Sequence, residues 1–184
     1  EYANGHIPNA ISLPIFSDNE RTEVGTLYKT DGQQPAIKRG LEIVGPKMRA
    51  LIEAAEELQS QKLRVHCWRG GMRSQSVAWL LETYGFEVSL LGGGYKSYRK
   101  AMRDCFEKPF DFRVITGYTG SKKTLILEAL NQSGEQVVDL EGLANHQGSS
   151  FGNVLTSGQP STEHFHNLLF ERLETLDLSR PIWI

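Results

Sequence analysis

Residues 63–74 read Leu-Arg-Val-His-Cys-Trp-Arg-Gly-Gly-Met-Arg-Ser, and this stretch decides the fold that we expect. Its apolar start predicts a short strand that delivers Cys67 into a loop rich in glycine and arginine. Residues 75–84 then predict an amphipathic helix that ends at Gly85. Loop amides and the positive end of the helix dipole converge on the sulfur, so the pKa of Cys67 should fall below that of a free thiol. The loop therefore indicates nucleophilic sulfur chemistry next to an anionic group.

The spacing around Cys67 fits two kinds of anion loop. From His66 to Ser74 the pattern His-Cys-x-x-Gly-x-x-Arg-Ser is that of cysteine phosphatases, in which a thiolate attacks phosphorus while amides and an arginine hold the oxygens. Rhodanese-like sulfurtransferases carry sulfur as a persulfide on a similar loop, which is more often one residue shorter. By itself this loop favours a phosphatase or another large anion. The residues that we expect to hold the anion are Arg69, Gly70, Gly71, Arg73 and Ser74.

A second glycine loop lies in the other half of the chain. Residues 117–124 read Gly-Tyr-Thr-Gly-Ser-Lys-Lys-Thr, close to the P-loop pattern Gly-x-x-x-x-Gly-Lys-Thr, with a predicted strand before them and a predicted helix after. In such a loop the backbone amides cradle a phosphate, the lysine reaches its oxygens and the threonine binds magnesium. The phosphate-binding residues that we expect are Gly117, Gly120, Lys123 and Thr124, with Mg²⁺ as a possible ion at Thr124.

Three residues near this loop need separate treatment. Lys122 stands where the pattern has its second glycine, and a side chain there should crowd the backbone approach to phosphate or strain the turn. Asp139 and Glu141 end a predicted strand at the sheet edge where parallel sheets place ligands, so both are possible site residues. We therefore predict a P-loop fold and leave open whether the loop binds a nucleotide, another diphosphate or nothing.

Strands and helices alternate along the chain, which predicts parallel α/β architecture throughout. A strand at 87–91 after the thiol loop and its helix implies a right-handed parallel crossover. In the first half we also expect a short strand that ends before Pro14, and a long loop over 17–34 with one helical turn at most. A core-facing helix follows, whose stripe includes Met48, Leu51 and Ala55. In the second half we expect strands at 112–116, 136–140 and 181–184, and helices at 123–130 and 162–176.

Composition excludes several classes of protein. Of the 184 residues, 39% are hydrophobic and 23% charged, without a long apolar run, so we expect a soluble, globular protein that does not cross a membrane. Two cysteines cannot form a disulfide framework and no Cys/His spacing predicts a zinc site, which fits a reducing, cytoplasmic setting. Net charge is -2, yet residues 62–103 hold eight basic and two acidic residues. This basic middle could attract a polyanion.

Several motifs in order identify a family. Gly-His-Ile-Pro-Asn-Ala at 5–10 resembles the turn that opens rhodanese domains, which argues against a plain phosphatase. Together with the thiol loop and the P-loop, the chain is similar to the tRNA 2-selenouridine synthase family over nearly its whole length. The other segments that carry this resemblance are Leu-Gly-Gly-Gly-Tyr-Lys at 91–96, Asp-Leu-Glu-Gly-Leu-Ala-Asn-His at 139–146 and Gly-Ser-Ser-Phe-Gly at 148–152.

The resemblance implies a transferase that modifies tRNA. Members replace the 2-thio sulfur of a wobble uridine with selenium from selenophosphate, through an S-geranylated thiouridine made with geranyl diphosphate. Cys67 matches the family's rhodanese cysteine, which would carry selenium or assist its delivery. The P-loop would hold a diphosphate, that of the prenyl donor or of a nucleotide. The partners implied are tRNA and small anionic substrates, and we expect no tightly bound cofactor and no metal site beyond Mg²⁺ at the P-loop.

The resemblance also implies a division of the chain. We expect a rhodanese-like domain in residues 1–106 that lacks its first strand, a linker at 107–111, and a C-terminally truncated P-loop-type domain in 112–184, the whole being a fragment of a longer protein. Two alternatives stay open: a rhodanese-like cysteine phosphatase, and a non-catalytic relative that binds tRNA or nucleotide and in which Lys122 has damaged the P-loop. The sequence predicts no oligomeric state.

Overall fold

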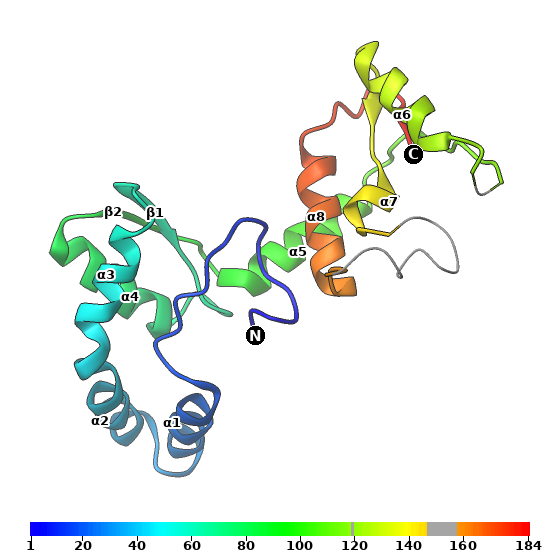
Figure 1. Cartoon of the computed structure of the whole chain (residues 1–184). Helices are drawn as coiled ribbons and strands as arrows, with labels where there is room; N and C mark the ends of the chain where they lie inside the picture. The colour runs from blue at the N-terminus through cyan, green and yellow to red at the C-terminus, as the bar shows by residue number, and fades with distance from the viewer. Residues whose placement is uncertain (119, 147–157) are drawn as a thin grey trace. The chain divides into compact units, whose positions relative to one another are not determined.

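The computed structural model describes residues 1–118, 120–146 and 158–184 of the chain (Figure 1). It divides the chain into two compact units, Ile11–Ser97 in one, and Glu1–Ala10 with Tyr98–Ile184 in the other. Both units contain parallel strands, with helices in the connections between them, so the predicted parallel α/β architecture is confirmed. The division into domains 1–106 and 112–184 with a linker at 107–111 remains a prediction from the sequence.

The unit Ile11–Ser97 is built on a two-stranded parallel sheet. Strand β1 (Lys62–Val65) pairs with β2 (Glu87–Leu90), with Leu63 opposite Val88, and α4 (Met72–Tyr84) connects them. The predicted strand–helix–strand order is therefore present. Gly85 ends α4 with a φ of 123°, a backbone conformation that favours glycine, which confirms its predicted place at the helix end.

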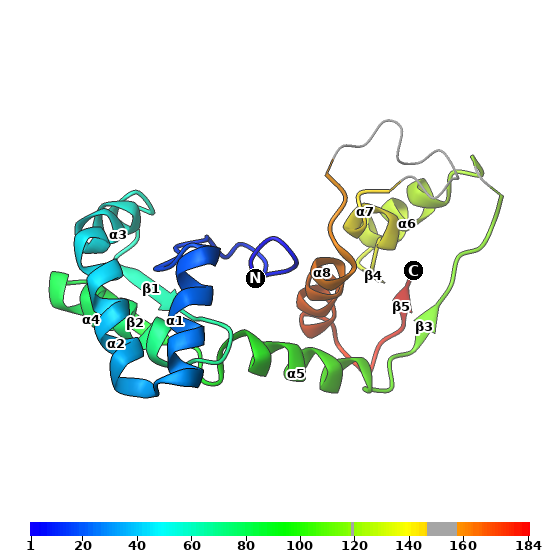
Figure 2. The same ribbon diagram turned by 90° about the horizontal axis from the view of Figure 1, so that it is seen from below.

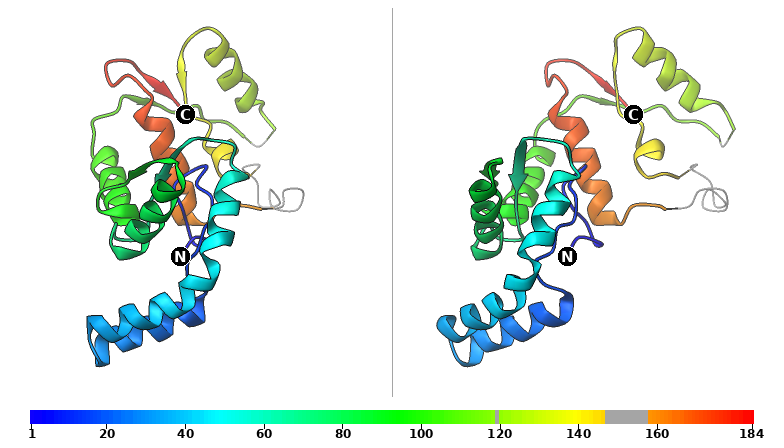
Figure 3. Two further views of the ribbon diagram at one scale, coloured as in Figure 1. Left: turned by 90° about the vertical axis from the view of Figure 1, so that its left-hand side faces the viewer. Right: turned by 60° about the vertical axis from the view of Figure 1, so that its left-hand side comes forward.

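Four helical segments precede this sheet. They are α1 (Asp18–Thr30), α2 (Gln33–Val44), a short 3₁₀ helix η1 (Gly45–Lys47) and α3 (Met48–Glu56), and α1 and α2 lie side by side (Figure 3). The predicted loop over 17–34 is wrong. Ser17 and Glu20 close a capping box, since the Ser17 hydroxyl accepts from the Glu20 amide and the Glu20 carboxylate accepts from the Ser17 amide. Because α1 buries no residue, it lacks the apolar periodicity by which helices are predicted.

The predicted strand before Pro14 is also absent, since residues 10–14 have no regular structure. The predicted core-facing stripe is present on α3, where Leu51 and Ala55 are buried. These two side chains share one buried cluster with Val77, Leu80 and Leu81 of α4. The buried core of this unit consists of Ile15, Leu51, Ala55, Val77, Leu80 and Leu81.

The other unit has a three-stranded parallel sheet in the order β3-β5-β4. Its strands are β3 (Phe112–Arg113), β4 (Gln136–Val137) and β5 (Ile182–Trp183), each shorter than the sequence predicts. The last strand of the chain thus lies in the middle, and Figure 2 shows β5 beside β3. Among the described residues, the helices of this unit are α6 (Lys123–Gln132), α7 (Leu140–Leu143), α8 (Thr162–Glu174) and the part of α5 (Gly94–Phe106) from Tyr98 onward.

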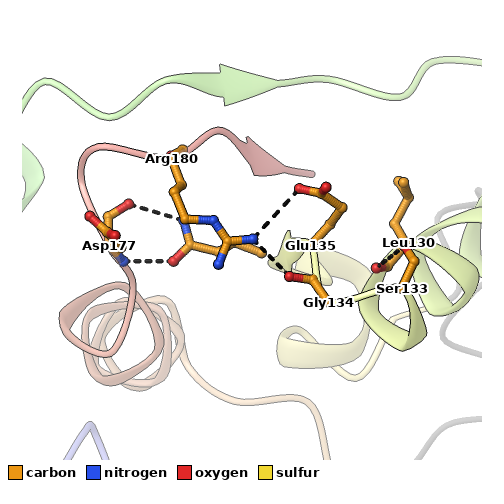
Figure 4. Close-up of polar contacts among 7 residues, drawn as sticks. Leu130, Ser133, Gly134, Glu135, Asp177 and Arg180 are labelled. Carbon is orange, nitrogen blue, oxygen red and sulfur yellow. Dashed lines mark hydrogen bonds and ion pairs between the residues drawn. The ribbon is translucent and has the colours of Figure 1, made fainter.

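Helices α5 and α8 supply the core of this unit. Its buried members are Met102, Cys105, Val138, Phe170, Leu173 and Ile182, of which Cys105 is a structural cysteine, as predicted. The turn between α8 and β5 is fastened to the end of α6 by Arg180 (Figure 4). The Arg180 guanidinium donates to the carbonyl oxygen of Gly134 at 2.7 Å and lies 3.8 Å from a carboxylate oxygen of Glu135.

The N-terminal segment Glu1–Ala10 is held on α8 by a buried polar cluster. Asn167 is fully buried, and its side-chain amide donates to the carbonyl oxygen of His6 at 2.8 Å. Arg99 of α5 donates to the Asn167 side-chain oxygen at 2.7 Å and to the Glu163 carbonyl oxygen at 3.0 Å. The His6 ring also lies 4.1 Å from that of His164, centroid to centroid. The Gly-His-Ile-Pro turn therefore has a structural anchor in this unit.

Candidate functional site

Cys67 directly follows β1 at the carboxyl end of the strand, in a loop that runs into α4. The side chain is half-buried and its Sγ lies 3.2 Å from the hydroxyl oxygen of Ser74. Ser74 is itself buried, with 2% of its surface exposed, and its single hydroxyl hydrogen can be donated either to the sulfur or to the Gly71 carbonyl oxygen, which lies 3.0 Å away. The loop thus closes on itself around the sulfur.

The surroundings of the sulfur favour its ionised form. Burial acts to raise the pKa of Cys67, but hydrogen bonds from the Ser74 hydroxyl and from the backbone N–H groups of Ser74, Arg69 and Gly71 outweigh it. The net result is a pKa below the ordinary value of a cysteine thiol. This confirms the direction expected from the sequence, and it makes Cys67 the more reactive of the two cysteines, because burial raises the pKa of Cys105.

The glycines after β2 hold the thiol loop in place. The backbone N–H of Tyr95 donates to the Cys67 carbonyl oxygen, and that of Lys96 to the Trp68 carbonyl oxygen, each at 2.9 Å. The approach is close because Gly94 has no side chain: with a φ of 61°, a Cβ there would lie 2.1 Å from the Cys67 carbonyl oxygen. Gly70, with a φ of 64°, is also packed closely, since a Cβ there would lie 2.9 Å from the backbone nitrogen of Gly94. The sequence marked residues 91–96 only as the end of a strand and as a family motif.

The predicted loop residues therefore divide by the part that each plays. Gly70 gives the close packing, Gly71 and Ser74 provide hydrogen bonds, and Arg69 contributes its backbone N–H. The guanidinium group of Arg69 is exposed, whereas Arg73 is half-buried in the first turn of α4. A site with these groups can hold an anion beside a thiolate.

His66 lies between the end of β1 and Cys67. Its ring nitrogen Nδ1 is buried without a hydrogen-bond partner among the described residues. Burial lowers the pKa of His66, against a smaller opposing contribution from a hydrogen bond with the Cys67 backbone. The ring is therefore neutral at pH 7, and it contributes no positive charge to the anion site.

The second predicted site is the loop between β3 and α6. Thr119 lies outside them. Gly120 has a φ of 81°, and Lys122, directly before α6, has a φ of 62°. The Lys123 ammonium group turns back onto the loop and donates to the carbonyl oxygens of Gly117 at 3.1 Å and Tyr118 at 3.4 Å. Lys122 thus adopts the left-handed conformation that suits the missing glycine, which supports the expected strain.

A cavity of about 350 Å³ adjoins this loop. Thr124 lines it together with the apolar side chains of Leu127, Val137 and Leu143, and with Asp139 and Arg172. The Asp139 carboxylate accepts from the Gly142 amide at 2.9 Å at the start of α7, and Arg172 donates to the Val137 carbonyl oxygen at 2.8 Å. Of the two possible acidic residues, Asp139 therefore shares a cavity with Thr124, and Glu141 does not line it.

The described residues contain no group of three or more His, Cys, Asp or Glu side chains that could hold a metal ion. Thr124 and Asp139 could still contribute oxygen ligands to a Mg²⁺ that takes its other ligands from phosphate and water, the usual mode for this ion. Within the described ranges, no helix is long and apolar enough to cross a membrane. The family segment at 148–152 lies outside the residues that the structure describes.

Comparisons with protein families agree with this arrangement. A model of the rhodanese-like domain matches residues 1–101, and the tRNA 2-selenouridine synthase AAA domain matches residues 110–180. A tRNA 2-selenouridine synthase from Pseudomonas fluorescens (strain Pf0-1) is 43% identical over 176 residues, which cover 92% of this chain and 47% of that protein. One from Nitrosomonas europaea is 38% identical over 192 residues, covering 99% and 49%. The chain spans about half the length of these curated relatives.

A solved structure is also similar. It is the N-terminal domain of a protein from Clostridium difficile 630 that is described as an ATP/GTP binding protein. The alignment has 43% sequence identity and a TM-score of 0.52, and it covers 54% of this chain and 79% of that one. This likeness supports the α/β fold of the matched part.

Proposed function

The chain belongs to the rhodanese-like family through residues 1–101, and we propose that it forms part of a tRNA 2-selenouridine synthase, which replaces a uridine 2-thio sulfur with selenium. The observation that carries this proposal is the pairing of a reactive thiol loop with a second domain of the tRNA 2-selenouridine synthase type in residues 110–180. The substrates would be tRNA, selenophosphate and geranyl diphosphate. A reducing, cytoplasmic setting stays a prediction.

The P-loop would serve the first step. In that step the 2-thio sulfur attacks the first carbon of geranyl diphosphate, a carbon–oxygen bond breaks and diphosphate leaves. Loop amides and the Lys123 ammonium group would hold the departing diphosphate, and Thr124 would help to bind Mg²⁺, which would neutralise its charge. Lys123 already lies across the loop that would hold the anion.

Cys67 would serve the second step, in which selenium replaces the alkylated sulfur. Carriage of selenium as a perselenide would need a two-electron oxidant, because selenium in selenophosphate is fully reduced. A redox-neutral route has the Cys67 thiolate add at the uridine C2 and geranylthiolate leave. The selenium of selenophosphate then displaces the Cys67 thiolate, and hydrolysis of the selenium–phosphorus bond releases phosphate. Of the two roles that the resemblance implies, this supports assistance in delivery over carriage, and the lowered pKa of Cys67 suits it.

The test separates the two steps. Full-length protein is incubated with thiolated tRNA, geranyl diphosphate and selenophosphate, and the nucleosides are analysed by mass spectrometry. Lys123→Ala should lose geranylation, whereas Cys67→Ser should accumulate geranylated uridine without selenated uridine. Cys105→Ala serves as the matched cysteine control and should keep both products. Absence of both products with the unaltered protein would refute the proposal.

A cysteine phosphatase is the second candidate, because five residues separate Cys67 from Arg73 and the thiol is activated. Hydrolysis of a generic aryl phosphate that disappears in Cys67→Ser would support it. If the unaltered protein leaves the aryl phosphate intact, this candidate is excluded.

A further inference from the structure

Three cations lie along one exposed side of α5. Lys96, Lys100 and Arg103 are all exposed, and their spacing of four and three residues places them on one face of the helix. The opposite face is buried through Tyr95, Met102 and Cys105. We call Lys96, Lys100 and Arg103 the α5 track.

The charges of the track have no partner among the described residues, because none of its three side chains makes an ion pair or hydrogen bond there. Many other basic side chains are paired with a carboxylate. Examples are Lys47 with Glu20 at 2.6 Å and Lys108 with Glu174 at 2.7 Å. Acidic residues do flank the track: Asp104 and Glu107 are exposed at its C-terminal end. The track is therefore a concentration of uncompensated positive charge in a chain whose net charge is -2.

The track begins at the thiol loop. The backbone N–H of Lys96 donates to the Trp68 carbonyl oxygen, and the preceding residue, Tyr95, bonds the Cys67 carbonyl oxygen. From Lys96 to Arg103 the helix rises about 10 Å, at about 1.5 Å per residue. Phosphates of a nucleic-acid strand follow one another about every 3.4 Å along a duplex axis, so this length can meet more than one phosphate.

We propose that the α5 track binds the phosphate backbone of the RNA substrate and leads it to the thiol loop. This rests on the proposed function, which supplies tRNA as the polyanion. Side chains that contact phosphates position a nucleic acid without reading its sequence. The track would therefore set affinity and placement, and the chemistry would stay with Cys67.

The experiment compares variants of equal charge in the full-length protein. Binding of a tRNA transcript is measured by fluorescence anisotropy over a range of salt concentrations. The triple variant Lys96→Gln/Lys100→Gln/Arg103→Gln should make the plot of log affinity against log salt less steep, reducing the size of its negative slope by about 3. Each phosphate contact contributes roughly 0.9 to that slope. The double variant Lys96→Gln/Lys100→Gln is matched by Lys29→Gln/Lys38→Gln, two exposed lysines of α1 and α2, which should leave the slope unchanged.

Turnover gives an independent readout. The triple variant should show a raised KM for tRNA with an unchanged kcat, because binding is lost while the thiol site stays intact. If the unaltered protein does not bind tRNA, the proposed function itself fails. If it binds and the triple variant keeps the same salt slope and KM, only the track is refuted. Unchanged tRNA binding with lost binding to anionic phospholipid vesicles would assign the track to a lipid surface and overturn the proposal.

Discussion

The backbone N–H of Tyr95 donates to the carbonyl oxygen of Cys67 at 2.9 Å, so the first turn of α5 fixes the loop that carries the reactive thiol. The helix start and the loop are 28 residues apart in the sequence, and β2 brings them together by pairing with β1. The conformation of the thiol site therefore depends on residues such as Tyr95 that hold the loop in place without a reactive group in the site. The glycines at this contact offer the most direct test.

Gly94→Ala should disrupt the thiol loop. A Cβ at this position would lie 2.1 Å from the Cys67 carbonyl oxygen, and the φ of 61° disfavours any side chain. We expect a loss of more than about 1 kcal/mol in the free energy of unfolding, measured by urea denaturation, and slower alkylation of Cys67. Gly25→Ala is the control, because it lies within α1 with open space around it and should stabilise slightly. Equal effects of the two changes would contradict this account.

Ser74→Ala should raise the pKa of Cys67, because the Ser74 hydroxyl is the strongest of the groups that lower it. The rate of iodoacetamide alkylation, measured against pH, should shift to higher pH. Folding lowers the pKa of the Cys67 thiol from its ordinary value of 9.0, so ionised Cys67 stabilises the folded protein above pH 9.0. This contribution is lost as pH falls through the pKa of Cys67 in the folded protein. The variant should lose part of this pH dependence. Ser76→Ala, which removes only a bond to the Met72 carbonyl oxygen, should leave the profile unchanged.

The thiol site shows what a sequence can and cannot predict. Cys67 and its loop residues are contiguous, so the strand, the loop, the helix and the lowered pKa all follow from local pattern. The bracing by Tyr95 and Gly94 depends on strand pairing, which no local pattern contains. Helix α1 was missed for a different reason. It buries no side chain, so its only signal in the sequence is the pair of capping residues Ser17 and Glu20.

The unit that contains residues 98–184, which we call the P-loop unit, was less predictable for a further reason. Three short strands of two residues each form its sheet, and the central one, β5, comes last in the chain. The sequence predicts strands of four or five residues here, but only their paired parts are regular. Asp139 was predicted as a possible ligand from its place at a strand end, and the structure adds a capping role at Gly142 that competes with that function.

Lys122→Gly should stabilise the P-loop unit. Lys122 adopts a φ of 62°, which costs an L-residue about 1–2 kcal/mol, partly offset in the variant by the greater freedom of glycine in the unfolded chain. We expect a net gain of about 0.5–1 kcal/mol in the free energy of unfolding and tighter binding of inorganic diphosphate, measured by calorimetry. Lys122→Ala removes the same charge but keeps a Cβ, so it should gain no stability. If both variants bind diphosphate like the original protein, Lys122 has not damaged the loop.

Asn167→Ala should release the N-terminal segment from α8. Asn167 is fully buried and joins the Arg99 guanidinium to the His6 carbonyl oxygen, so its removal leaves both groups without this partner. The unmade bonds should cost about 1–3 kcal/mol, more at a charged group than at a neutral one. Hydrogen exchange followed by mass spectrometry should show faster exchange in residues 1–10, with Asn19→Ala, an exposed position in α1, as the control. Unchanged exchange at residues 1–10 would contradict this account, because the Asn167 hydrogen bonds would then not hold the N-terminal segment on α8.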